Sequence, residues 1–377
     1  QTIALGSVKS QIAHTKAAAG VASLIKVSLA LYHKVLPATI HVNMPNPKLE
    51  IEKSPFYLNT EIRPWVKPAK HARRGGVSSF GFGGTNFHVA LEESESEQTG
   101  AYRLNSTSKV VLLSAPTPEE LLTGCQGWSE KLKSPQAKQE FINLVSAWIA
   151  KAIPQSDARV GFVAANEGEA VSQLAAAVEL IKAKADQESA EHPAGVYYRK
   201  NGLDPQGKMV ALFPGQGSQY VDMGRELTVN FPPMRQVFAD MDAAFNADGL
   251  RPLSSVVFPP PAFESSQKEL QSNNLTRTEH AQPAIGTLST GLYLLLQQAG
   301  FKADFSAGHS FGELTALWAA GVYDDNGYIA LAKARGKAMA PPADPYFDAG
   351  TMLAVKGDVA LLQEELKAFP EITLANW

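Results

Sequence analysis

The sequence predicts an α/β protein built from more than one domain. From Met209 onward, short apolar runs of strand length alternate with longer segments of helical periodicity, an order that favours a parallel sheet. Two polar, turn-rich stretches, Glu92–Gly100 and Asn201–Gly207, have the composition of exposed connectors. At 377 residues the chain has room for two or three compact domains, each with its own core.

Composition excludes several classes of function. Hydrophobic residues make up 45% and charged residues 19%, as in ordinary globular proteins. The 34 basic and 37 acidic side chains give a formal charge of −3, so we expect neither a nucleic-acid partner nor an anionic membrane. The most apolar long stretch, Gly20–Leu36, carries three basic or imidazole side chains and is too polar to span a bilayer. With one cysteine, Cys125, and no leader-like N-terminus, we expect a cytoplasmic protein without an internal disulfide.

The first and middle segments each combine strands with helices. In the first, apolar spacing predicts one helix, Thr15–Leu36, and two strands around the Gly83-Gly84 turn, Val77–Phe82 and Phe87–Leu91. In the middle segment the pattern predicts a small α/β domain. Its expected strands are Val110–Ser114, Val160–Ala164 and Gly195–Tyr198, and its expected helices are Pro118–Lys131, Gln136–Ile149 and Glu169–Lys182.

In the third segment we expect a strand at Met209–Phe213, a helix at Ala281–Ala299 and a strand at Asp304–Ala307 that leads into another helix. Near the end, the runs Thr351–Val355, Val359–Ala368 and Ile372–Ala375 predict strand, helix and strand, the start of a smaller subdomain. The sequence begins inside one patterned segment and ends directly after another, so we expect a fragment of a larger protein.

A nucleophile motif stands between the predicted strand Asp304–Ala307 and the helix that follows it. Gly308-His309-Ser310-Phe311-Gly312 is a G-x-S-x-G elbow, in which a sharp turn exposes the serine hydroxyl and glycines let strand and helix pass closely. The helix N-terminus and the amide of the next residue then face a developing oxyanion. Taken alone, the five residues also fit an ordinary strand–helix turn.

Two further residues are candidates for the same site. Gln216, held between Gly215 and Gly217 after the strand Met209–Phe213, has the position to present a hydrogen-bond donor, although a structural turn is the alternative. Arg335 lies on a predicted helix 25 residues after Ser310. Its guanidinium suits bidentate binding of a carboxylate, although isolated helical arginines are usually solvated or salt-bridged.

These motifs together resemble the malonyl-CoA:acyl carrier protein transacylases and the acyltransferase domains of polyketide and fatty acid synthases. The matching runs, in family order, are GQGSQ, T-x-x-A-Q-P-A (Thr278–Ala284), GHSFGE (Gly308–Glu313) and ARGKAM (Ala334–Met339). The resemblance implies an α/β-hydrolase-like core in which Ser310 is the nucleophile and Gln216 and the Phe311 amide are oxyanion donors. It also implies that Arg335 binds the free carboxylate of malonyl, with Gln282 and His309 in the substrate pocket.

The implied reaction is a ping-pong transfer in which Ser310 takes malonyl from coenzyme A and passes it to the phosphopantetheine thiol of an acyl carrier protein. No bound cofactor or metal is implied. In this family the general base is a histidine far downstream of the nucleophile. Because no histidine follows His309, whose side chain should diverge from its neighbour Ser310, we expect the base to lie beyond Trp377.

The N-terminal third carries a second resemblance. The run Val8–Thr15 (VKSQIAHT) is similar to the K-S-N-I-G-H-T block of β-ketoacyl synthases, and Phe80–Asn86 (FGFGGTN) to their C-terminal glycine-rich segment. The resemblance implies the C-terminal part of a thiolase-like fold, with His14 in the condensation site and Lys9 supporting it. Gln11 and Ala13 depart from the family's asparagine and glycine, and the nucleophilic cysteine and first histidine are expected upstream of Gln1. Outside the family match, a histidine satisfied by backbone is the alternative for His14.

We therefore expect three domains: residues 1–93 from a ketosynthase, a linker at 94–206, and an incomplete malonyl-type acyltransferase at 207–377. From about residue 346 the last of these would start a ferredoxin-like subdomain. Within the family, the sequence looks most like bacterial omega-3 polyunsaturated fatty acid synthases, then iterative type I polyketide synthases. Expected partners are acyl carrier protein domains, malonyl-CoA, other synthase domains and a second copy bound through the ketosynthase. The alternatives are a stand-alone esterase or thioesterase and a catalytically incomplete scaffold.

Overall fold

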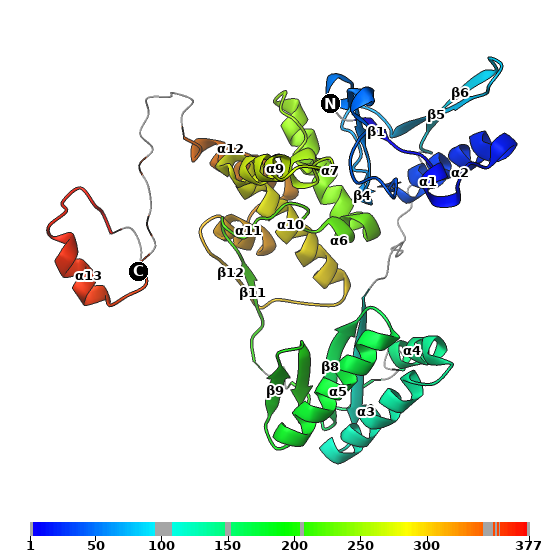
Figure 1. Cartoon of the computed structure of the whole chain (residues 1–377). Coiled ribbons are helices and arrows are strands. Elements are labelled where there is room, and N and C mark those ends of the chain that lie inside the picture. Colours follow the sequence, from blue (N-terminus) through cyan, green and yellow to red (C-terminus); the bar gives the residue numbers. More distant parts are fainter. Residues whose placement is uncertain are drawn as a thin grey trace. The chain divides into compact units, whose positions relative to one another are not determined.

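Figure 1 shows a computed structural model of the chain, which describes residues 3–94, 108–147, 152–203, 207–341, 350, 353 and 355–374. The chain divides into a large unit, Gln1–Ala338, and a small unit, Met339–Trp377, each of which is described by itself. No helix among the described residues combines the length and the apolar character that crossing a bilayer requires.

The first segment of the large unit is a long helix packed on a hairpin, with short paired strands beside it. Its elements are β1 (Ile3–Leu5), α1 (Lys9–Ile12), η1 (Lys16–Ala18), α2 (Ala19–His33), β2 (Val35–Leu36), η2 (Pro47–Leu49), η3 (Ile51–Lys53), β3 (Phe56–Leu58), β4 (Arg63–Pro64), β5 (Arg74–Phe80) and β6 (Asn86–Glu92). Strand β1 pairs with β3 in parallel, while β2–β4 and β5–β6 are antiparallel. Helix α2 approaches β5 closely at Gly75, where a Cβ would lie 2.5 Å from Cγ1 of Val27.

The helix predicted over Thr15–Leu36 is shorter at both ends. Lys16 has φ = 54° and begins the 3-10 turn η1, so α2 starts only at Ala19. At the other end Lys34 adopts a left-handed conformation with φ = 59°, and Val35 then pairs with Pro64 in the β2–β4 ladder. The apolar spacing continues past Lys34 because Val35 is buried, in a strand rather than in the helix.

The middle segment is a two-layer domain with its own core. Its elements are β7 (Lys109–Ala115), α3 (Pro118–Leu132), α4 (Ala137–Ser146), β8 (Ala158–Ala164), α5 (Glu167–Lys184), β9 (Ser189–His192) and β10 (Val196–Arg199). The antiparallel sheet has the order β7-β8-β10-β9 and packs against the helices. Two predicted helices are capped at their N-termini: Thr117 accepts from the Glu120 amide and Asn166 from the Glu169 amide. The small α/β domain predicted here is confirmed.

The third segment contains the parallel strand pair that the sequence predicts. Its elements are β11 (Val210–Phe213), α6 (Arg225–Asn230), α7 (Pro232–Ala247), α8 (Ser254–Val257), α9 (Ser265–Thr276), α10 (Thr278–Gln298), β12 (Phe305–Gly308), α11 (Gly312–Ala319) and α12 (Asp325–Ala338). Strand β11 pairs with β12 from Val210↔Phe305 to Phe213↔Gly308. Helix α10 contacts α7, α11 and α12, which places it at the centre of this segment.

Only part of the prediction for the end of the chain falls on described residues of the small unit. Helix α13 (Val359–Leu366) confirms the predicted helix, and Asp358 caps it by accepting from the amides of Ala360 and Leu361. The strand predicted at Thr351–Val355 lies largely outside the described residues. The strand predicted at Ile372–Ala375 is wrong for its described part, residues 372–374. There the Ile372 amide donates to Phe369 in a turn, and no described strand pairs with this segment.

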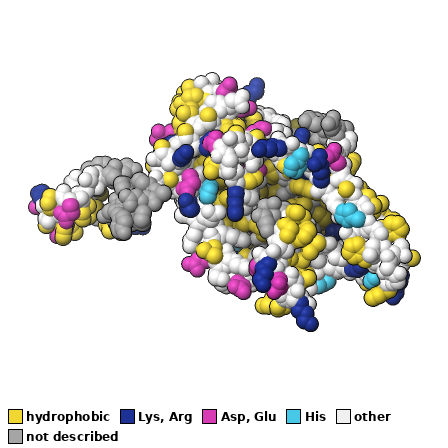
Figure 2. All heavy atoms as spheres, turned by 90° about the horizontal axis from the view of Figure 1, so that it is seen from above, with side chains coloured by type: hydrophobic (Ala, Val, Ile, Leu, Met, Phe, Trp, Pro, Cys, Tyr) yellow, Lys and Arg dark blue, Asp and Glu magenta, His cyan; other side chains and the backbone are white. Residues whose placement is uncertain are grey.

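Charge is mixed over the surface. On the face shown in Figure 2, basic and acidic side chains are interspersed and no extended region carries one sign. This distribution agrees with the near-balanced composition, a formal charge of −3.

Candidate functional site

The serine elbow is formed by glycines that admit no side chain. Ser310 has φ = 53°, a left-handed conformation, between the end of β12 and the start of α11. A Cβ on Gly308 would lie 2.0 Å from the carbonyl carbon of Gly312, and one on Gly312 would lie 2.1 Å from the Phe213 oxygen. Strand, turn and helix therefore pass in backbone contact, and the Ser310 side chain is exposed at the turn.

The loop after β11 lies against this elbow. Because β11 and β12 are parallel and Phe213 pairs with Gly308, both strands end at the same edge. The His309 amide donates to the Phe213 oxygen at 3.1 Å. A Cβ on Gly215 would lie 2.5 Å from the His309 oxygen and 3.3 Å from Cβ of Ser310. The residue that follows Gly215, Gln216, is thus held beside the serine by strand register.

A hydrogen-bonded chain joins four of the predicted site residues. Arg335 Nη2 lies 3.5 Å from Ser310 Oγ, at the outer limit of a hydrogen bond, and Arg335 Nη1 donates to Gln282 Oε1 at 2.7 Å. Gln282 Nε2 donates to Gln216 Oε1 at 3.2 Å, and Gln216 Nε2 donates to Thr278 Oγ1 at 3.3 Å. The side chains come from the loop after β11, from α10, from the elbow and from α12.

The aromatic ring of Phe311 lies against the Arg335 guanidinium. The ring is fully buried, and the Arg335 guanidinium carbon lies 6.0 Å from its centroid, within the range of a cation–π contact. Gly286 on α10 makes room for the ring, since a Cβ there would lie 2.9 Å from it. The Phe311 amide precedes the first residue of α11, and in the described part of the chain it donates no hydrogen bond. It is therefore available to an oxyanion beside Ser310.

The two predicted residues of the N-terminal segment are not joined. His14 is exposed, and its Nδ1 accepts from the Lys16 amide at 3.0 Å. Lys9 is exposed on α1, and no hydrogen bond within the described residues links it to His14. The loop is instead fixed by Lys26, whose ammonium donates to the oxygens of Ser7, Gln11 and Ala38. Burial lowers the pKa of Lys26.

Other candidate groups do not gather near Ser310. Cys125 is fully buried in the middle domain, and burial raises its pKa to about 12, so its thiol is a poor nucleophile there. Across the described ranges, no group of three His, Cys, Asp or Glu side chains has the arrangement of a metal site.

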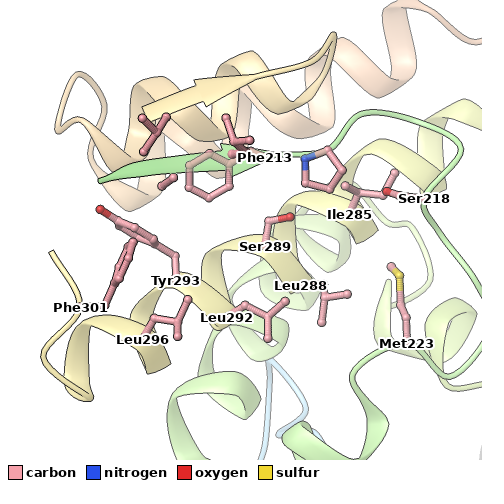
Figure 3. Close-up of a pocket in the computed structure, with 14 residues that line it drawn as sticks. Phe213, Ser218, Met223, Ile285, Leu288, Ser289, Leu292, Tyr293, Leu296 and Phe301 are labelled. Carbon is pink, nitrogen blue, oxygen red and sulfur yellow. The ribbon is translucent and has the colours of Figure 1, made fainter. Parts of the chain in front are cut away.

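One cavity of the third segment is not lined by any of the predicted site residues. It measures about 380 Å³ and lies beside β11, with Tyr293, Leu292 and Leu296 of α10 projecting into it (Figure 3). Phe213 and Phe301 complete an almost wholly apolar lining.

Sequence reasoning missed Thr278 as a side chain of the site. It is the first residue of α10 and is one helical turn before Gln282. The available signal was the T-x-x-A-Q-P-A spacing, since residues four apart share one helix face.

Three protein-family models match successive parts of the chain. Residues 210–376 match the acyl transferase domain, residues 1–43 match the β-ketoacyl synthase C-terminal domain, and residues 45–164 match the ketoacyl-synthetase C-terminal extension. The extension spans the predicted connector at Glu92–Gly100 and reaches β8 of the middle domain.

Individual relatives match almost the whole length of this chain. A polyunsaturated fatty acid synthase polypeptide from a Thraustochytrium species is 35% identical over 377 residues, which is 95% of this chain and 13% of that protein. Mycoketide-CoA synthase from Mycobacterium tuberculosis is 33% identical over 382 residues, 99% of this chain and 8% of that protein. The chain thus spans only a small part of each relative.

A solved structure supports the fold of the third segment. The acyl transferase domain of ZmaA superposes with a TM-score of 0.50 at 22% identity, covering 64% of this chain and 51% of that one. The predicted α/β fold class is confirmed, and so is the order of a ketosynthase end followed by an acyl transferase domain. The chain is therefore a ketosynthase–acyltransferase segment of the kind found in polyunsaturated fatty acid and polyketide synthases.

Proposed function

We propose that the acyl transferase domain carries malonyl from coenzyme A to the phosphopantetheine thiol of an acyl carrier protein through an ester on Ser310. The observation that carries the proposal is the position of Arg335, whose guanidinium lies 3.5 Å from the Ser310 hydroxyl and is held there by Gln282. A fixed cation beside the nucleophile favours an acyl group that bears a free carboxylate.

The residues divide the chemistry as follows. Ser310 Oγ attacks the thioester carbonyl and loses its proton to a general base, for which we propose a histidine. The Phe311 amide and Gln216 donate to the oxyanion of the tetrahedral intermediate. This intermediate expels the coenzyme A thiolate, which takes up the proton. The phosphopantetheine thiol then attacks the ester and Ser310 leaves as the alcohol. His309, which lies against Gly215, lines the substrate pocket together with Gln282.

For the ketosynthase end, we propose that His14 polarises the thioester carbonyl during decarboxylative condensation and that Lys9 supports it. The exposed loop that follows α1 supports this role for His14, because Ala13 and Lys16, both with positive φ, hold His14 at a sharp turn. The domain limits 1–93, 94–206 and 207–377 remain our proposal, as do dimerisation through the ketosynthase and the acyl carrier protein as partner. A bacterial omega-3 polyunsaturated fatty acid synthase is the proposed parent, and the cytoplasm its proposed location.

A hydrolase is the competing function for an exposed serine elbow. An esterase or thioesterase needs the oxyanion donors but has no use for a cation that a second helix holds beside the hydroxyl. The contact between Arg335 and Gln282, a side chain that is only 1% exposed, therefore favours transfer of a carboxylated acyl group. A pure scaffold would need none of these contacts.

The test is covalent labelling of the full-length synthase with radioactive malonyl-CoA. We expect a base-labile ester that Ser310→Ala abolishes and that Ser306→Ala, on the preceding strand β12, retains. Arg335→Ala should lower the malonyl-to-acetyl labelling ratio by about a hundredfold, the loss of one charged hydrogen-bonded pair. Lys337→Ala, on the last turn of the same helix and exposed, is the matched control.

Three results would contradict the proposal. They are equal labelling by acetyl-CoA and malonyl-CoA in the wild type, a label that survives Ser310→Ala, or an unchanged ratio in Arg335→Ala. Rapid hydrolysis of the ester without transfer to a carrier protein would favour the hydrolase.

A further inference from the structure

We propose that Thr315 and Tyr328 are positioning residues for acyl selection, because the hydrogen bond between them sets the place of the Arg335 guanidinium relative to Ser310. This inference rests on the proposed function and adds two residues that act through Arg335. Its basis is a contact between α11, the helix that follows the nucleophile, and α12, the helix that carries the arginine. Thr315 Oγ1 lies 2.7 Å from Tyr328 Oη.

The two hydroxyls are shielded from solvent. Thr315 is 0% and Tyr328 is 2% exposed, so water cannot take the place of either partner. Burial raises the pKa of Tyr328, so its phenol stays neutral near physiological pH. The pair is therefore a fixed, uncharged hydrogen bond, and removing one hydroxyl deprives the other of its partner.

Helical spacing connects each hydroxyl to one side of the site. Thr315 follows Phe311 by four residues and Ser310 by five, so it shares a helix face with Phe311 at the start of α11. Tyr328 precedes Arg335 by seven residues, or about two helical turns, so both side chains leave α12 on the same side. The bond between the hydroxyls thus joins the helix of the nucleophile to the helix of the guanidinium.

A glycine of α10 makes room for this contact. A Cβ on Gly286 would lie 2.5 Å from Tyr328 Oη and 2.9 Å from the Phe311 ring, so the phenol and the ring fill the space that a side chain would need. The Arg335 guanidinium carbon lies 6.0 Å from the centroid of the same ring. A shift of α12 relative to α11 would therefore displace the phenol and the guanidinium together.

Two further contacts join α11 and α12 on the side away from the arginine. The Trp318 and Tyr328 rings pack with centroids 5.7 Å apart, and Trp318 Nε1 donates at 2.8 Å to Oδ1 of Asp325, the first residue of α12. Neither contact involves the Tyr328 hydroxyl, so Tyr328→Phe should keep the two helices packed. The hydroxyl bond can therefore be removed without removing the fold.

The experiment measures the second-order rate constant for acylation of Ser310 in the full-length synthase by malonyl-CoA and by acetyl-CoA. Tyr328→Phe keeps the ring and Thr315→Val keeps the side-chain shape. We expect each to lower the malonyl-to-acetyl ratio about fivefold, since one neutral hydrogen bond is lost, and to leave the acetyl-CoA value unchanged. Thr315→Ser, which keeps the hydroxyl, should stay within about twofold of the wild type. Tyr323→Phe is the matched control, because it removes a phenol hydroxyl from the connection between α11 and α12 and leaves the Thr315–Tyr328 bond intact.

A second set of variants shows whether the pair acts through the arginine. In an Arg335→Ala background, Tyr328→Phe should lower the malonyl-to-acetyl ratio no further, because the guanidinium that it positions is absent. Thr315→Val combined with Tyr328→Phe should lower the ratio no more than either change alone, because both remove the same bond. A loss of general packing would lower the rates with both thioesters in every background.

The outcomes separate this inference from the function on which it rests. No malonyl ester in the wild type, or a ratio that Arg335→Ala leaves unchanged, would overturn the proposed function and this inference with it. A ratio that Arg335→Ala lowers and that Tyr328→Phe and Thr315→Val leave unchanged would overturn the inference alone. Equal losses with the two thioesters would also overturn it, and so would a further fall when Tyr328→Phe is added to Arg335→Ala.

Discussion

Among the described residues, one buried carboxylate of the N-terminal segment and one of the acyl transferase domain differ in their surroundings. Glu93, beside β6, lies 2.6 Å from the Arg73 guanidinium and 2.9 Å from the Lys34 ammonium. Asp242, on α7, is 3% exposed and is hydrogen-bonded to the amide and hydroxyl of Ser254, without an ion-pair partner among the described residues. The surroundings of Glu93 carry positive charge, whereas those of Asp242 offer uncharged hydrogen-bond donors.

Their pKa values move in opposite directions as a result. Burial alone would raise the pKa of Glu93, but the Arg73 amide, the Lys34 ammonium and the Arg73 guanidinium together lower it to about 2. Burial raises the pKa of Asp242 to about 6, because the Ser254 hydroxyl and the amides of Ser254 and Leu253 offset only part of the desolvation. Burial therefore does not fix the charge of a carboxylate, whereas its neighbours do.

The largest expected effect is the loss of the Glu93 charge. Glu93→Gln removes the carboxylate that pairs with both Arg73 and Lys34 inside this segment, so we expect its free energy of unfolding to fall by about 3 kcal/mol. Hydrogen exchange of the β5 and β6 amides under increasing urea measures that loss locally.

The matched control is the adjacent residue. Glu92 pairs with Arg74 at 2.6 Å, but both side chains are more than half exposed, so Glu92→Gln should cost less than about 1 kcal/mol. Equal losses for Glu92→Gln and Glu93→Gln would show that the buried cluster does not stabilise the segment.

Neither carboxylate could be identified from the sequence. Glu92 and Glu93 are adjacent, and which of them is buried depends on where β6 ends and on Lys34, which lies 59 positions earlier. Asp242 is one of two acidic residues on α7, and its partner Ser254 lies 12 positions later, beyond the end of that helix. Long-range packing decides both environments, and local spacing does not carry that information.

The Ser310 site was more predictable, because its residues belong to motifs whose spacing has a geometric meaning. The elbow, the glutamine after β11 and the arginine on α12 were all predicted, and the structure brings Ser310, Gln216, Gln282 and Arg335 into one chain of hydrogen bonds. Thr278 was missed as a side chain because its partner lies 62 positions away. Helix ends set by left-handed residues, such as Lys34, were missed because lysine gives no sequence signal for that conformation.

An effect of similar size is expected in the pH dependence of the acyl transferase domain. The folded pKa of Asp242, about 6, lies above its ordinary value of 3.8, so the stabilisation due to its protonated form is complete below pH 4 and is lost as pH rises through 6. Over that interval the domain should lose about 3 kcal/mol. Urea unfolding at a series of pH values, followed by exchange of the α7 amides, measures the change.

Asp242→Asn should remove this loss, since an amide keeps hydrogen bonds to Ser254 and carries no proton equilibrium. Asp240 is exposed on the same helix, and its side chain accepts from Gln236, so Asp240→Asn should leave the wild-type profile intact. For the segment that contains Glu93 we expect the reverse dependence on pH. The stabilisation due to its charged form is complete above pH 4.5 and is lost as pH falls toward 2. If the two segments lost stability in the same pH direction, the contrast between charge and dipoles would be wrong.

The smallest expected effect comes from removing the Ser254 hydroxyl while its backbone amide is kept. Ser254→Ala keeps the amide bond to Asp242 Oδ1 and loses the hydroxyl bond to Oδ2, so the pKa of Asp242 should rise further and the pH-dependent loss should extend to higher pH. The cost near neutral pH should be about 1 kcal/mol. Ser255→Ala is the neighbouring control, because the Ser255 hydroxyl donates to the Pro252 oxygen. Its loss should lower stability by a similar amount at every pH, whereas a shifted profile in Ser255→Ala would mean that packing around α8, rather than the Ser254 hydroxyl, sets the charge of Asp242.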